Sequence, residues 1–78
     1  MSVLKRLALN DEGFVFDPAT GDSYLLNPTA GVLVRGIQEG VEEADLWERL
    51  VDRFEIDREQ ASSDVDDFLI QLRALRLL

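Results

Sequence analysis

The amino-acid sequence predicts an α+β fold, a winged-helix-like small domain with three short N-terminal strands followed by three helices. The chain has 78 residues, a length that suits one domain with a small core. Its pattern changes near Asn27, from strand-like stretches before this residue to helical spacing after it. The apolar residues fall into periodic groups, as in folded chains. We therefore expect residues 1–78 to form a single domain.

The part before Asn27 predicts a small sheet. We expect strands over Val3–Leu9, Phe14–Phe16 and Ser23–Leu26. The second of these has the aromatic and β-branched residues that strands favour. A loop with Pro18 and Gly21 separates the last two strands, and both residue types are common in turns. The economical interpretation is a hairpin.

The first predicted helix begins at Asn27-Pro28. Asparagine caps free backbone N–H groups, and proline at the first helical position loses no needed donor. Gly40 lies where a C-terminal cap is expected. Inside this helix, Gly31 and Gly36 each cost about 1 kcal/mol relative to alanine, which suggests close packing at both positions. The apolar face of this helix contains Ala30, Leu33, Val34 and Ile37.

Two further helices are predicted. The second is expected over Glu43–Phe54, and the third opens at Asp57 and Gln60, which form a plausible capping-box pair. The second carries Leu46, Trp47, Leu50, Val51 and Phe54 at helical spacing, and the third carries Ala61, Val65, Phe68, Leu69, Leu72 and Leu75. Ile70 and Leu77 fall outside the main stripe. They are either scattered exposed residues or part of a docking or self-association patch.

The charge of the chain argues against nucleic-acid binding. Sixteen acidic residues against eight basic ones give a net charge of −8, whereas binding to phosphate backbones requires clustered lysine and arginine. A DNA-binding winged helix would also need a basic third helix. This segment instead contains Glu59, Asp64, Asp66 and Asp67.

The composition also argues against catalysis. The chain has no cysteine and no histidine, and so lacks the commonest ligands for zinc and the usual general base. We expect no catalytic residues, no metal and no cofactor. No stretch approaches the ~20 apolar residues of a membrane span, and the segment Met1–Asn10 does not resemble a signal peptide. A cytoplasmic location is expected by default.

Several stretches, taken in order over residues 10–78, resemble the PqqD family of peptide chaperones, also known as RiPP recognition elements. Tyr24–Ala30 resembles the family's leucine-asparagine-x-threonine-alanine signature, and Asp64–Leu72 resembles its pattern in the last helix. The tail Leu75–Leu78 resembles the closing glycine-leucine-leucine, except that Arg76 replaces the glycine. Phe14–Gly21 is most similar to a branch found beside an HPr-kinase-related protein.

The resemblance implies a function in natural-product biosynthesis. Family members bind the leader of a ribosomally made precursor peptide as an added strand, in a groove walled by the last helix, and present it to a modifying enzyme. The implied partners are therefore a precursor peptide and a peptide-modifying enzyme. The implied peptide-binding residues are Ser23, Tyr24, Leu25, Leu26, Val65, Phe68, Leu69, Leu72 and Arg73.

Several alternatives stay open at this point. The apolar residues of the last helix are also explained by plain core packing. Arg73 and Arg76 either form a solvated helix end that suits the dipole or pair with an acidic leader. Which side of the strand 23–26 faces the groove is not fixed, nor is the oligomeric state. The rival function is a generic adaptor or dimerisation module, in which a partner helix docks on the apolar stripe.

Overall fold

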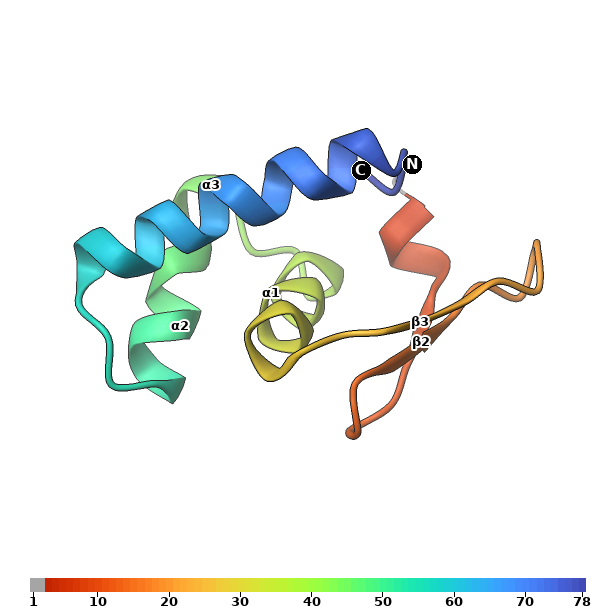
Figure 1. Ribbon diagram of the computed structural model, residues 1–78, viewed down its shortest axis with the longest axis horizontal. Coiled ribbons are helices and arrows are strands. Elements are labelled where there is room, and N and C mark those ends of the chain that lie inside the picture. The colour runs from red at the N-terminus through yellow and green to blue at the C-terminus, as the bar shows by residue number, and fades with distance from the viewer. Residues whose placement is uncertain (1–2) are drawn as a thin grey trace.

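The computed structural model describes residues 3–78 and places the strands before the helices, as predicted. The elements are η1 (Val3–Arg6), β1 (Ala8–Leu9), β2 (Phe14–Phe16), β3 (Ser23–Leu25), α1 (Pro28–Gln38), η2 (Glu43–Asp45), α2 (Leu46–Arg53) and α3 (Arg58–Ala74). α1 lies in the middle of the molecule, with α2 at one end and the strands at the other (Figure 1). α3 runs along one side, past α2 and α1 toward η1. The predicted α+β class is confirmed.

The three strands form one antiparallel sheet in the order β1-β2-β3. The registers pair Leu9 with Val15, and Val15 with Tyr24. Because paired residues point to the same face of a sheet, these three side chains share the face that packs on the core, where Val15 is only 2% exposed. The opposite face carries the exposed side chains of Phe14, Phe16 and Leu25.

The first segment differs from the predicted strand over Val3–Leu9. Residues 3–6 form a 3₁₀ turn, and only Ala8–Leu9 pairs as a strand. Leu4 and Leu7 are both buried, and a spacing of three places them on one side of a 3₁₀ helix. The Gln38 side chain also donates hydrogen bonds to both of their carbonyls, at 3.0 and 2.9 Å. Hydrogen bonds from the Gln38 side chain of α1 therefore take the place of strand pairing in this segment.

Side-chain caps fix where α1 and α3 begin. Asn27 Oδ1 accepts a hydrogen bond from the Ala30 amide at 2.8 Å, and Asp57 Oδ1 accepts one from the Gln60 amide at 2.8 Å. The Gln60 side chain donates to Asp64 instead of returning to the cap. Both predicted starts are confirmed, but only half of the capping box forms.

The core lies where α1, α2 and α3 meet and continues under the sheet. Its buried apolar residues are Leu4, Leu7, Val15, Leu33, Val34, Ile37, Leu46, Leu50, Ala61, Val65, Leu69, Leu72 and Leu77. Gly36 allows α2 to approach α1, because a Cβ there would lie 3.0 Å from Leu46 Cδ2. A Cβ at Gly31 would meet nothing within 4 Å. The predicted close packing is therefore confirmed at Gly36 and wrong at Gly31.

The C-terminal end of α3 is closed by a left-handed residue. Arg76 has φ 58°, and the Leu77 amide donates to the Leu72 carbonyl at 2.9 Å, as in a Schellman cap. Leu77 is buried, whereas Ile70 is 64% exposed. These two residues therefore do not form one surface patch. The Leu77 carbonyl accepts a hydrogen bond from the Leu4 amide at 3.2 Å.

An ion pair joins η1 to the loop after β2. Arg6 donates to both carboxylate oxygens of Asp17, at 3.2 and 3.1 Å, and Asp17 is only 4% exposed. The hydrogen bond from Arg6 lowers the pKa of Asp17 below its ordinary value, against the opposing effect of burial. The Ala19 amide adds a further hydrogen bond to this carboxylate at 2.9 Å. The loop that leads into β3 is thereby held in place.

Candidate functional site

β3 lies at one edge of the sheet, and within residues 3–78 no strand pairs with its outer side. The hydrogen bonds at the two ends of the β2–β3 ladder are Leu26 N to Gly13 O and Asp17 N to Asp22 O, both 2.8 Å. Hydrogen-bonded pairs alternate along an antiparallel ladder. Given the register, Tyr24 and Leu26 direct their backbone groups toward β2, and Ser23 and Leu25 direct theirs toward the open edge.

Gly13 makes its own backbone hydrogen bond with Leu26 possible. It has φ 91°, and a Cβ at this position would lie 2.6 Å from the carbonyl oxygen of Leu26. Such a contact is too short for any other residue, so the glycine allows the chain after β3 to remain bonded to the hairpin. The end of β3 is thereby fixed next to the start of α1.

An apolar groove of about 180 Å³ lies between β3 and α3. It is lined by Tyr24, Leu25 and Leu26 on the strand side and by Phe68, Gln71, Leu72 and Leu75 on the helix side. Core residues such as Val15 and Val34 form its floor. The floor of the groove is therefore also the surface of the hydrophobic core.

A second hollow of about 260 Å³ continues the groove along α3 toward its N-terminal end. The two share Asn27, Ala30, Phe68 and Gln71. The continuation is polar and acidic, because Asp64 and Asp67 of α3 face Thr29 of α1 across it. The groove thus has an apolar part and an acidic part.

The predicted peptide-binding residues divide into two groups. The groove is lined by Tyr24, Leu25, Leu26, Phe68 and Leu72. The four others lie elsewhere. Val65 and Leu69 are buried in the core at 4% and 6% exposure, and Ser23 is exposed outside the lining. Arg73 Nη2 lies 2.8 Å from Glu43 Oε1, so this cation is directed toward η2.

Several lining residues were absent from the predicted set. Gln71 and Leu75 lie three and seven residues after Phe68, so helical periodicity alone places them on the same face. Asn27 and Ala30 were assigned to the cap and the apolar face of the first helix. That they also border the groove follows from how α1 meets α3, which is a tertiary contact.

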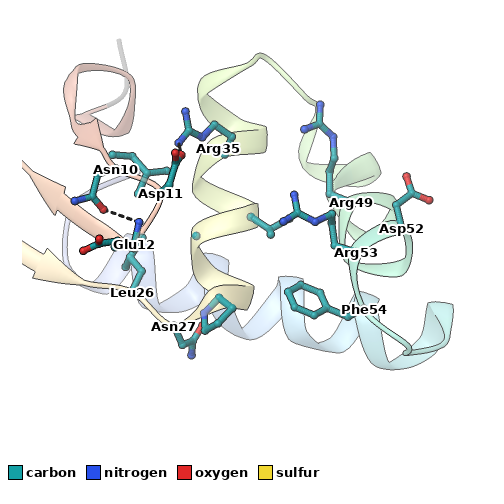
Figure 2. A pocket seen from close by; sticks show the side chains of 15 residues that line it. Asn10, Asp11, Glu12, Leu26, Asn27, Arg35, Arg49, Asp52, Arg53 and Phe54 are labelled. Atoms are coloured by element: carbon teal, nitrogen blue, oxygen red, sulfur yellow. Dashed lines mark hydrogen bonds and ion pairs between the residues drawn. The ribbon is translucent and has the colours of Figure 1, made fainter.

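A larger hollow, about 580 Å³, lies on the opposite side of α1. Figure 2 shows Arg35 beside Asp11, and Arg53 and Phe54 extending from the α2 side toward α1. Its lining is balanced in charge, with Arg35, Arg49 and Arg53 against Asp11, Glu12 and Asp52. Arg35 lies 3.6 Å from Asp11, and Arg49 pairs with Glu39.

Neither a metal centre nor a membrane helix is present in the described part of the chain. Residues 3–78 bring together no group of three acidic, histidine or cysteine side chains able to hold a metal ion. No helix in this range is long and apolar enough to cross a membrane. The candidate site consists of the groove and the strand edge beside it.

Similar known proteins identify the family of this chain. No curated protein matches the chain. Among solved structures, the chain is similar to lasso peptide synthetase B1 complexed with the leader peptide, with a TM-score of 0.71 and 26% sequence identity over 91% of this chain and 85% of that chain. The family model for coenzyme PQQ synthesis protein D (PqqD) matches residues 12–78. The match spans nearly the whole sequence, and the chain belongs to the PqqD family.

Proposed function

We propose that this chain binds the leader segment of a ribosomally synthesised precursor peptide and presents it to a modifying enzyme. The leader adds as a strand to the open edge of β3 and packs its side chains against α3. Strand addition obtains affinity from backbone hydrogen bonds and selectivity from neighbouring side-chain pockets. The open edge of β3 and an apolar groove lie side by side in this domain.

The observation that carries the proposal is the direction of the backbone groups in β3. Ser23 and Leu25 present N–H and C=O groups at an edge that no described strand covers. The apolar groove lies directly beside this edge. A short edge strand with open backbone groups is a ready template for another chain.

The comparisons support the same function. The similar solved structure is complexed with a leader peptide, and the likeness covers most of both chains. The chemistry on the peptide is assigned to a separate enzyme, because the sequence has no histidine and no cysteine. Within this proposal the domain supplies binding and orientation alone.

Two proline variants test the proposal. Leu25→Pro removes an N–H that points outward, so the variant should fold like the parent and bind peptide at least about tenfold more weakly. Tyr24→Pro removes an N–H bonded to β2, so it should mainly lower the melting temperature. The ligand is a peptide selected on the parent from a phage-displayed library of random 12-residue sequences. Circular dichroism measures folding, and fluorescence anisotropy measures affinity.

Leu25→Ala is the matched control, because it shortens the same side chain and keeps the amide. Its affinity should lie much closer to that of the parent than the affinity of Leu25→Pro. A partner helix docked on the apolar groove takes nothing from the β3 backbone. If Leu25→Pro folds and binds like the parent, strand addition is wrong and the adaptor function replaces it.

A further inference from the structure

The groove beside α3 changes in chemistry from one helical turn to the next. Leu72, Phe68 and Asp64 are spaced by four residues, and each lines the groove or its continuation. Four residues of an α-helix rise about 6 Å. Two residues of an extended strand span about 6.6 Å. Alternate side chains of a strand lying along α3 therefore meet successive turns of this helix.

The first two of these turns offer apolar contact. Phe68 and Leu72 border the apolar part together with Tyr24 and Leu26, and Phe68 and Tyr24 are partly buried against the core. Two alternate apolar side chains of an added strand fit this part. This much follows from the proposed function and from the spacing alone.

The third turn offers negative charge. Asp64 and Asp67 line the continuation of the groove, and neither forms an ion pair with any residue in the range 3–78. Within residues 3–78, no lysine or arginine lines either part of the groove. Arg73, which follows the lining residue Leu72 on α3, pairs with Glu43. Among the described residues, the charged side chains that line the groove are therefore all acidic.

We propose that the peptide bound by this domain carries a lysine or arginine two residues from an alternating pair of apolar residues, so that its cation meets Asp64 and Asp67. The inference rests on the proposed function and deepens it, since it specifies the class of peptide. A peptide with an acidic residue at that position is disfavoured by like-charge repulsion within a domain of charge −8.

The selection of random 12-residue peptides on the parent provides the first readout. Enriched sequences should contain the alternating apolar pair with lysine or arginine at the third alternate position. If the cation precedes the apolar pair in the peptide sequence, the peptide runs in the same direction as α3. If the cation follows the apolar pair, the peptide runs antiparallel to α3. Both orders support the proposal, because either places the cation at the acidic end.

A double-mutant cycle on one selected peptide provides the second readout. Replacing its cation by alanine should weaken binding to the parent by about two- to fivefold, as for a partly exposed ion pair. The same replacement should have almost no effect with Asp64→Asn/Asp67→Asn. The matched control is Glu59→Gln/Asp66→Asn, which removes two charges from α3 outside the groove lining and should keep the dependence on the cation.

A change of charge sharpens the test. Asp67 makes no hydrogen bond to another described side chain, so Asp67→Lys should fold like the parent. Selection on this variant should no longer enrich lysine or arginine at the position where the parent does, because the new cation offsets the charge of Asp64. Enrichment of the same cation on both proteins would overturn the inference.

The two proposals fail in different ways. If the selected peptides keep the apolar pair and lose affinity for Leu25→Pro, but show no preference for a cation, only the inference about the peptide is wrong. If binding is indifferent to Leu25→Pro, or if the parent enriches no peptide, the proposed function fails and this inference fails with it.

Discussion

The two sides of α1 each have a hollow, and the two hollows differ in the residues that line them. On the α2 side, the larger hollow is lined by three arginines and three acids, and two of the arginines pair with acids of the same chain. On the α3 side, the smaller groove is apolar and borders the unpaired edge of β3. Size alone would select the charge-balanced hollow and not the groove of the proposed site. Unused hydrogen-bonding capacity beside apolar surface is the better guide to a peptide site.

Each hollow contains one partly buried phenylalanine, Phe68 in the groove and Phe54 on the other side. Phe68→Ala and Phe54→Ala should each lower the free energy of unfolding by about 2 kcal/mol, less than the ~3–5 kcal/mol of a fully buried phenylalanine. Only Phe68→Ala should also abolish peptide binding. Urea denaturation and anisotropy on the two variants measure these effects, and equal losses of affinity would remove the distinction between the hollows.

The sheet supports both hollows, and low pH should weaken it through Asp17. The hydrogen bond from Arg6 lowers the pKa of this carboxyl in the folded state. A lowered pKa stabilises the fold above the ordinary value of about 3.9 and loses this contribution as the pH falls through the folded value. The melting temperature of the parent should therefore fall more steeply than that of Asp17→Asn between about pH 5 and pH 3. Parallel curves for the two proteins would contradict this assignment.

The fold was largely predictable from local signals. Asn27 and Asp57 cap the helices where the sequence placed them, because capping depends on neighbours a few residues away. The 3₁₀ turn at residues 3–6 was missed because it depends on Gln38, which is more than thirty residues distant. Long-range side-chain bonds of this kind leave no periodic pattern.

The site was predictable in part for a similar reason. Phe68 and Leu72 share a helical face with Val65 and Leu69, and the sequence could not divide this face between groove and core. The structure divides it, because Val65 and Leu69 are buried in the core whereas Phe68 lines the groove beside β3. The direction of Arg73 likewise depended on the position of Glu43.

The C-terminal cap of α3, beside the groove, contains a residue whose replacement should stabilise the fold. Arg76 has φ 58°, a conformation that disfavours residues with a Cβ and suits glycine. Arg76→Gly should raise the free energy of unfolding by about 0.5–1 kcal/mol. Thermal denaturation checks this, with Arg73→Gly as a control that should destabilise the last turn of α3. A lower melting temperature for Arg76→Gly would show that the arginine side chain stabilises this end.

The smallest effect is expected on the α2 side. Arg53 is exposed and forms no ion pair with any residue from 3 to 78, so Arg53→Gln should change the free energy of unfolding by less than about 0.5 kcal/mol. Its affinity for the selected peptide should equal that of the parent. A clear loss of affinity would extend the peptide site across α1 and end the contrast between its two sides.

The hydrogen bond between Leu4 and Leu77 has a consequence for any second polypeptide fused to this domain. It brings the first and last described segments together, and both residues also line the apolar groove. Any polypeptide joined to either end of the domain would therefore leave the surface next to the groove. A short flexible linker at such a point gives the attached partner an effective concentration in the millimolar range. Fusion at either end would thus favour delivery of a weakly bound leader to the attached enzyme.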